Sequence, residues 1–197
     1  MSAGLLSFLL VLAVPLLGAV VVYNRLVGLR NEFRNAFAQI DVQLKRRHDL
    51  VPGLVEVARA YLRHERQTLE AVTAARQGAS AARASAAQRP TDAAAIAKLD
   101  TAEIALSGAM SRFFALVEQY PELKADETLG RLTEELTGTE NRIGFARQAF
   151  NDAVTDFNTS AQRFPANVVA TLFGFREAGL LRATRTEAEQ RPVSVAL

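Results

Sequence analysis

Apolar and polar positions follow two different patterns along the chain, and the change comes near residue 24. Residues 3–23 are almost wholly apolar and uncharged, and Asn24-Arg25 follows directly. A helix of about 20 apolar residues, at about 1.5 Å per residue, crosses the roughly 30 Å hydrocarbon core of a bilayer. The pattern therefore predicts a transmembrane anchor at residues 1–24, with bilayer contact through residues 3–23.

Beyond the anchor, apolar residues recur in alternating steps of four and three. Such heptad spacing is typical of helices that pack along a seam. Pro52 lies inside this pattern, so we expect one long helix with a kink near Arg47–Val51. The seam consists of Phe33, Phe37, Ile40, Leu44, Arg47, Val51, Leu54, Ala58, Tyr61, Glu65, Thr68, Val72 and Ala75.

Two further seams follow, separated from the first by residues 78–92. That stretch is rich in alanine and lacks large apolar residues, so we expect a connection that builds no core, with helix-start chemistry at Pro90-Thr91-Asp92. A second helix should end at Pro121, and a third at Phe164-Pro165. The second seam is Ile96, Leu99, Glu103, Leu106, Met110, Phe113, Val117 and Tyr120; the third is Leu129, Leu132, Leu136, Thr139, Ile143, Ala146, Phe150, Ala153, Phe157 and Phe164.

These elements predict an all-α fold. Short turns join antiparallel neighbours, so we expect an elongated antiparallel helical bundle of three long helices, a short C-terminal helix and an N-terminal transmembrane helix. The bundle should occupy residues 25–181, followed by a flexible polar tail at residues 182–197. No segment alternates with period two over a useful length, so we expect essentially no sheet.

Composition excludes several functional classes. The formal net charge is only +2, which is far from the basic footprint of a nucleic-acid-binding protein. Cysteine is absent, and this rules out thiolate metal sites and thiol nucleophiles. His48 and His64 lie outside the usual metal-binding motifs. We therefore expect a protein that is not an enzyme and that uses no metal or cofactor.

The distribution of arginines predicts the orientation of the anchor. No basic residue precedes the apolar stretch, whereas Arg25, Arg30 and Arg34 follow it. By the positive-inside rule, the N-terminus lies outside and the body is cytoplasmic. A cleaved signal peptide is the alternative and would send the body outside, but such peptides begin with a basic region.

Polar residues cluster at two places that are candidates for interaction or for setting helix register. Asn151 and Asn158 are one heptad apart and could bond across helices to the asparagines of the first helix, which would fix the register. The alternative is an exposed docking surface. The candidates are Asn31, Asn35, Gln39, Asp41, Arg46, Arg47, Glu140, Asn141, Arg147, Asn151 and Asn158.

Three segments carry a family resemblance: YNRLVGLRNEFRNAFAQIDVQLKRRHDLVPGLVEVARAYLRHE, YPELKADETLGRLTEELTGTENRIGFARQAFNDAVTDFNT and FPANVVATLFGF. Together they resemble the LemA family of bacterial membrane-anchored proteins. The chain has Phe37 where the family often has Trp, and Gly53 where a larger polar residue is usual. The resemblance implies a helical bundle with an N-terminal span, the N-terminus outside and the body inside. It implies no reaction, because the family has no established biochemical activity.

Two functional hypotheses follow. The first is a non-enzymatic, membrane-anchored helical scaffold or partner-binding module with an unidentified protein partner. The second is an accessory or regulatory subunit of a membrane protease or an envelope-stress system. The heptads are compatible with pairing inside one chain and with a homo-oligomer.

Overall fold

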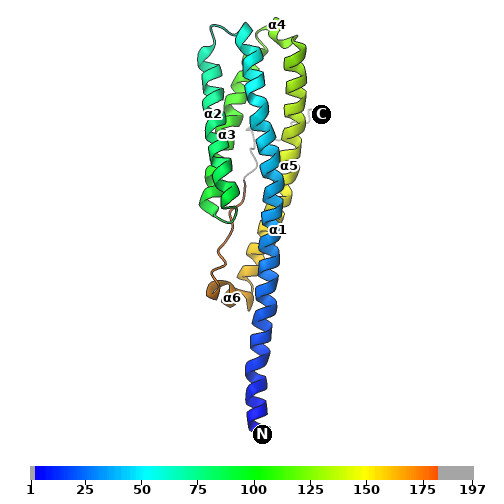
Figure 1. Cartoon of the computed structure of the whole chain (residues 1–197), viewed down its shortest axis with the longest axis vertical. Helices are drawn as coiled ribbons and strands as arrows, with labels where there is room; N and C mark the ends of the chain where they lie inside the picture. The colour runs from blue at the N-terminus through cyan, green and yellow to red at the C-terminus, as the bar shows by residue number, and fades with distance from the viewer. Residues whose placement is uncertain (1–2, 182–197) are drawn as a thin grey trace, which may run out of the picture.

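One long helix organises the molecule. The computed structural model describes residues 3–181, with side chains from residue 13 onward. Helix α1 (Ala3–Tyr61) has 59 residues and runs from the N-terminus to the far end of the bundle (Figure 1). Its N-terminal end is long and apolar enough to cross a membrane, which suggests membrane anchoring. Val14, Leu16 and Leu17 in this part are exposed.

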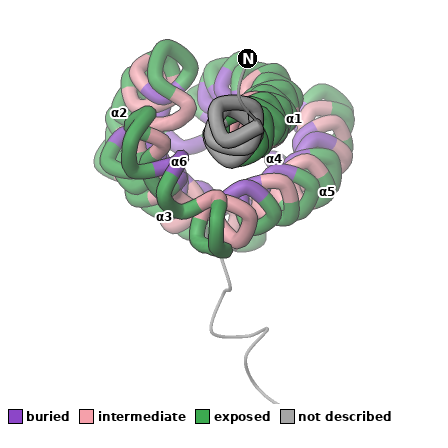
Figure 2. Tube along the Cα trace, turned by 90° about the horizontal axis from the view of Figure 1, so that it is seen from below, coloured by how far each residue is buried: buried purple, intermediate pink, exposed green. Residues whose placement is uncertain are grey.

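The remaining helices fold back along the upper part of α1. Helices α1, α2, α3 and α5 run alternately up and down, and Figure 2 shows their buried residues on the sides that face one another. The predicted all-α antiparallel bundle is confirmed, and residues 3–181 contain no strand. The other elements are α2 (Arg66–Gln88), α3 (Ala93–Val117), α4 (Pro121–Lys124), α5 (Glu127–Gln162) and α6 (Ala166–Leu172).

The first predicted seam is divided between two helices rather than one. α1 ends at Tyr61, residues 62–65 reverse the chain, and α2 begins at Arg66. No glycine or proline marks this reversal in the sequence. Leu62 is buried at the turn, and α2 packs back on α1 through Leu69 and the residues that follow it. Packing therefore decides the break, and the bundle has four long helices where three were expected.

The predicted connection at residues 78–92 is wrong for most of its length. α2 continues to Gln88, and only residues 89–92 form the turn. Alanine has the highest helix propensity, and its small side chain lets neighbouring helices approach closely. Ala79 and Ala86 are fully buried in the core. The predicted tail at residues 182–197 lies outside the described residues.

Side-chain caps fix the starts of α3 and α5, and the start of α3 is the one that the sequence predicts. The Asp92 carboxylate accepts a hydrogen bond from the Ala94 amide at 2.9 Å and caps α3. Asp126 caps α5 in the same way, and the hydrogen bond from the Leu129 amide lowers the pKa of its carboxyl group. The Tyr61 hydroxyl also donates to Asp126 at 3.1 Å, which joins the end of α1 to the start of α5.

Gly53, the glycine at a position where a larger polar residue is usual in the family that this chain resembles, lies where α1 and α5 pack closely. A Cβ atom added at Gly53 would lie 3.2 Å from Cδ1 of Leu132 on α5. Pro52 precedes this glycine and lies inside α1 without ending the helix. A larger side chain at position 53 would require Leu132 to shift.

The core has two apolar parts. The part near the far end is built around Leu54, Val72 and Phe113. The part near the apolar N-terminal end of α1 is built around Phe33, Phe150 and Phe157, and the Phe33 ring meets the other two edge to face at 6.4 and 5.2 Å. Between the two parts lies a layer of polar side chains.

Candidate functional site

The polar layer centres on a buried carboxylate shared by two basic residues. Arg47 and His48 on α1 and Glu103 on α3 are all buried. Arg47 Nη1 donates to Glu103 Oε2 at 2.9 Å, and His48 Nε2 lies 2.7 Å from Glu103 Oε1. Both oxygens of the Glu103 carboxylate are therefore engaged.

Further contacts connect this layer to the other long helices. Arg47 Nη2 donates to the Ser107 hydroxyl at 2.8 Å, and its Nε lies 2.7 Å from Glu140 Oε1 on α5. Burial raises the pKa of the Glu140 carboxyl group, and the neighbouring Arg47 partly offsets that rise. Arg76 on α2 donates to the His48 carbonyl oxygen at 3.5 Å. The layer therefore touches all four long helices.

The space beside this layer is small. A cavity of about 40 Å³ is lined by Arg47, Glu103, Glu140 and the apolar residues above and below them. One water molecule needs about 10–15 Å³ by this kind of measure, whereas sites for small-molecule ligands span about 300–1,000 Å³. The cavity has room for water, and the polar side chains beside it bond to one another across the helices.

Two asparagines on α5 hold a segment of extended chain. Residues 174–181, which we call the C-terminal strap, follow α6 and run back along the bundle (Figure 1). The Asn158 side chain donates to the Ala178 carbonyl at 3.0 Å and accepts from the Ala178 amide at 2.9 Å. Asn151 makes the same pair of bonds with Leu181, at 2.8 and 3.0 Å. Each asparagine side chain thus bonds to the backbone amide and carbonyl groups of one strap residue.

The strap fills the space between α3 and α5, whose backbones have few direct contacts. Ala178 and Leu181 are buried in the same core part as Phe150, and a Cβ atom at Gly179 would lie 3.0 Å from Cα of Ala93 at the start of α3. The prediction that Asn151 and Asn158 bond to asparagines of the first helix is therefore wrong. Ala178 and Leu181 are buried outside any helix, so their backbone groups need partners, and the two asparagine side chains supply them.

The other predicted polar residues divide into paired and exposed groups. Asp41 pairs with Arg83 on α2 at 2.7 Å, and Arg46 Nε donates to Glu135 on α5 at 3.1 Å. Arg147 lines the small cavity beside Glu140. Asn31, Asn35, Gln39 and Asn141 are exposed.

Sequence reasoning missed three members of the polar layer: His48, Glu103 and Ser107. The signal for Glu103 was present, because it stands at an apolar seam position of its helix just as Arg47 does on the first helix. Two opposite charges on facing seams predict a buried ion pair. His48 is adjacent to a seam position, and nothing in the spacing distinguishes it from a surface residue.

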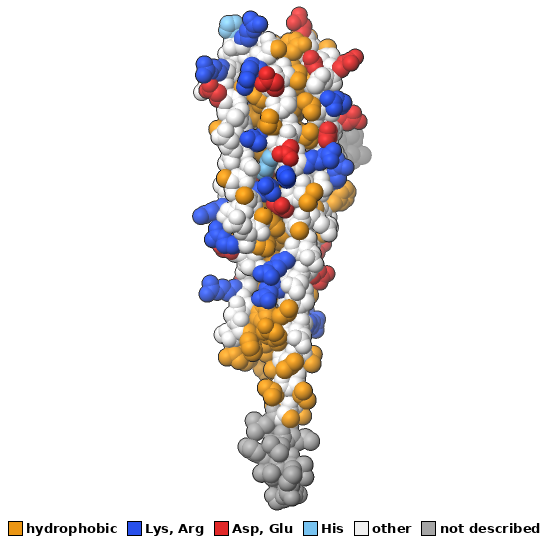
Figure 3. Space-filling model, viewed as in Figure 1, with side chains coloured by type: hydrophobic (Ala, Val, Ile, Leu, Met, Phe, Trp, Pro, Cys, Tyr) orange, Lys and Arg blue, Asp and Glu red, His pale blue; other side chains and the backbone are white. Residues whose placement is uncertain are grey.

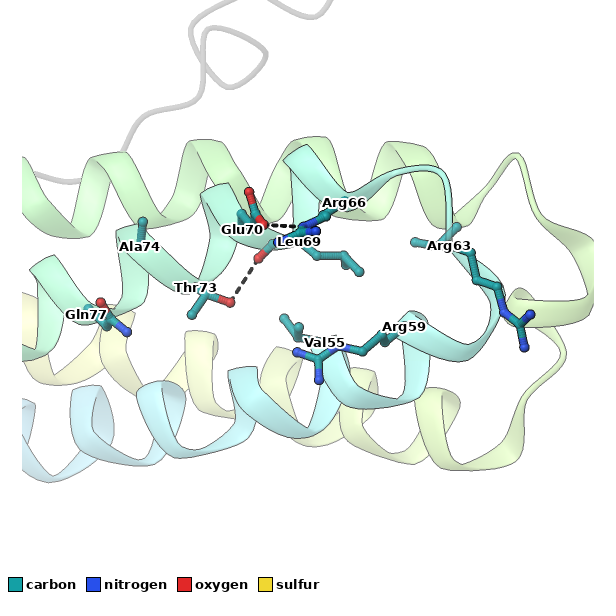
Figure 4. A pocket seen from close by; sticks show the side chains of 10 residues that line it. Val55, Arg59, Arg63, Arg66, Leu69, Glu70, Thr73, Ala74 and Gln77 are labelled. Carbon is teal, nitrogen blue, oxygen red and sulfur yellow. Dashed lines mark hydrogen bonds and ion pairs between the residues drawn. The ribbon is translucent and has the colours of Figure 1, made fainter.

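A second candidate site is an open groove between α1 and α2 near the far end of the bundle. It has a volume of about 680 Å³. Figure 4 shows Val55 on α1 and Leu69 on α2 along its apolar floor. Arg59, Arg63 and Arg66 lie along it. Arg59 pairs with Glu56 at 3.1 Å and Arg66 with Glu70 at 2.6 Å. The remaining arginine, Arg63, gives the groove a net positive charge.

Comparison with known proteins decides the family. The LemA family matches residues 36–196, which is most of the chain. The chain belongs to the LemA family. Protein LemA of Metamycoplasma hominis is 26% identical over 164 residues, covering 83% of this chain and 70% of that protein.

Other relatives are magnetosome proteins. Magnetosome protein MamQ 2 of Paramagnetospirillum magneticum is 33% identical over 70 residues, which are 36% of this chain and 26% of that protein. Magnetosome protein MamQ of Magnetospirillum gryphiswaldense is 31% identical over 68 residues, 34% of this chain and 25% of that protein. This LemA-family chain therefore matches about a quarter of the length of the magnetosome proteins.

We expect Glu103→Ala to destabilise the bundle strongly. The variant removes one of the two carboxylate partners of buried Arg47 and the carboxylate partner of His48, and loss of a partner from a buried ion pair costs about 3–5 kcal/mol. The control is Arg46→Ala, because the Arg46–Glu135 pair is largely exposed and such pairs contribute about 0–1 kcal/mol. Chemical denaturation of the full chain in detergent measures both free energies of unfolding. Similar small losses for the two variants would show that the layer is not a buried ion pair.

We expect Asn151→Ala and Asn158→Ala to release the C-terminal strap. Each variant loses two hydrogen bonds, and each bond contributes about 0.5–1.5 kcal/mol net. Hydrogen exchange of the strap amides should therefore quicken by about tenfold or more, while exchange in α1 stays unchanged. Asn141→Ala, an exposed change on the same helix, is the control. If the strap amides exchange equally slowly in all three variants, Asn151 and Asn158 do not hold the strap in place.

Proposed function

We propose that this chain is a non-catalytic, membrane-anchored scaffold that presents a partner-binding groove at a fixed height above the bilayer. The observation that carries this proposal is the continuity of α1, which is both the candidate span and a core helix of the bundle. The likeness to MamQ, named as a magnetosome protein, agrees with association with a membrane.

The continuity of α1 gives the groove a defined position. From Asn24 to Tyr61 the helix advances about 55 Å at about 1.5 Å per residue. The upper part of α1 packs along both α2 and α5, and the polar layer fixes its register against the other long helices. A partner bound at the groove would therefore be held at the far end of a rigid column.

The chemistry of the groove favours an acidic amphipathic segment of a partner protein. Its floor is apolar, at Val55, Leu62 and Leu69. Arg59 and Arg66 are each paired with a glutamate, so Arg63 supplies the net positive charge of the groove. An amphipathic helix places one apolar face in such a groove and its charges along the edges. Complementary charge would raise the association rate and set the orientation of the helix.

The small size of the cavity at the polar layer supports a role without catalysis. The ionisable side chains that line it contact one another across helices. The larger groove carries arginines and apolar side chains, which suit binding.

We also propose that the N-terminus is outside and the bundle cytoplasmic, because Arg25, Arg30 and Arg34 follow the apolar stretch. The chain has no cysteine. A single cysteine at position 145 on α5 should therefore react with a membrane-impermeant maleimide in inside-out vesicles and not in right-side-out vesicles. The reverse labelling would overturn this orientation.

The groove is tested by photocrosslinking in native membranes. A photoreactive residue at Thr73, in the groove, should give one discrete adduct. Arg63→Glu with Arg66→Glu should reduce the yield of that adduct by about tenfold or more, because both charges now repel an acidic partner. The matched control is Arg131→Glu with Arg142→Glu on the exposed face of α5, which should leave the yield unchanged.

Each outcome of this experiment has a defined meaning. Equal adduct yields from the two double variants would contradict the groove as a binding site, as would the absence of any adduct. Identification of the adduct then separates the hypotheses. A protease subunit would favour an accessory role in a membrane protease system, and a second copy of this chain would mean that the groove mediates self-association.

A further inference from the structure

A cluster of exposed apolar side chains lies beside α1 where it enters the bundle. Phe164 and Leu172 are 83% and 77% exposed, and Val168 and Phe173 are also exposed. They lie on α6 and at its two ends. We call these four residues the collar. Isolated exposed apolar residues are ordinary, but a contiguous group marks an interaction surface.

The collar is fixed to α1 by its own small core. Val169 and Ala170 on α6 are buried against Leu26 of α1. The Tyr23 ring meets the rings of Phe173 and Phe175 edge to face, at 4.9 and 5.6 Å between centroids. The exposed side chains are therefore held at one level along α1.

That level is the boundary of the candidate membrane span. Val20 and Val21, on the turn of α1 before Tyr23, are exposed and continue the apolar surface of the span. On the face drawn in Figure 3, hydrophobic side chains gather at the lower end of the bundle and along α1 beneath it. The collar and the exposed apolar side chains of the span thus lie next to each other along α1.

Basic side chains lie next to the collar. Arg25 and Arg163 line a small pocket of about 170 Å³ together with Phe164. Arg30 lies over the Phe175 ring, 5.0 Å from its centroid. Within the described part of the chain, no ion pair to a carboxylate engages these three arginines. Aromatic rings and arginines at the edge of an apolar band are typical of the interface between headgroups and acyl chains.

We propose that the collar is a second membrane contact, in which α6 and its flanking phenylalanines enter the interfacial layer and Arg25 and Arg163 bind lipid phosphates. The partner is an anionic phospholipid surface on the side of the membrane that carries the bundle. This contact does not depend on the distal groove. Together with the span, it holds the bundle at a fixed tilt, which a single span alone does not do.

The absence of tryptophan makes a direct test available. Full-length Phe173→Trp is reconstituted into vesicles with and without lipids brominated near the top of the acyl chains. Quenching of the tryptophan emission by about half or more is expected, because interfacial helices lie about 5–10 Å into the headgroup and acyl boundary. Phe145→Trp is the matched control: Phe145 is 76% exposed on α5 within the bundle, and its emission should be unaffected.

A third variant, Leu17→Trp, reports on the anchor itself. Quenching at position 17 without quenching at position 173 would overturn the collar and leave the anchor in place. Equal quenching at positions 145 and 173 would also overturn it, because the bundle would then lie flat on the bilayer. The absence of quenching at position 17 would overturn the span and the collar together.

The phosphate contact has its own readout. Replacing neutral lipid by anionic lipid should increase the quenching of Phe173→Trp, and adding Arg25→Gln and Arg163→Gln should remove that increase. Persistence of the increase in the glutamine variant would show that these two arginines do not bind the headgroups.

Discussion

The continuity of α1 is the constraint on which the rest of the structure depends. One helix meets two different surroundings, with exposed apolar side chains at Val14 and Leu17 and a buried seam from Phe33 to Ala58. No linker separates the two parts, so movement of the bundle relative to the span requires bending of α1 itself. Helices α2 and α5 pack along this helix and α3 packs on α2, so the position of the groove between α1 and α2 is set by α1.

The polar layer divides the core and limits how the helices can slide. A shift of α1 by one turn would separate Arg47 from Glu103 and Glu140 and leave buried charges without partners, which is costly. The C-terminal strap adds a second constraint at the α3–α5 gap through bonds from Asn151 and Asn158 to its backbone. Register is thus set by polar contacts, while most of the stabilising burial comes from apolar seams.

Much of the fold follows from local sequence signals, and the exceptions have physical causes. Heptad spacing predicts the helices and the buried positions of Phe150 and Phe157, and Asp92 predicts the start of α3. The reversal at residues 62–65 has no turn residue to reveal it, because its stability comes from contacts with distant residues. The position of the strap was not predictable either. The Asn151 side chain bonds to backbone atoms of Leu181, and backbone atoms leave no pattern in the sequence. The candidate site was predicted in part, through Arg47 and Glu140, whereas His48 required the three-dimensional packing.

The central claim is that α1 is one rigid helix from the membrane boundary to the groove. Spin labels at Asn24→Cys and Ala60→Cys, both exposed positions, measure this directly in the full chain reconstituted in lipid nanodiscs. The account predicts a single narrow distance distribution centred at about 50–60 Å, as expected for 36 residues of continuous helix. A broad distribution, or one centred below about 45 Å, would show that α1 bends or breaks between the span and the groove and would contradict the account.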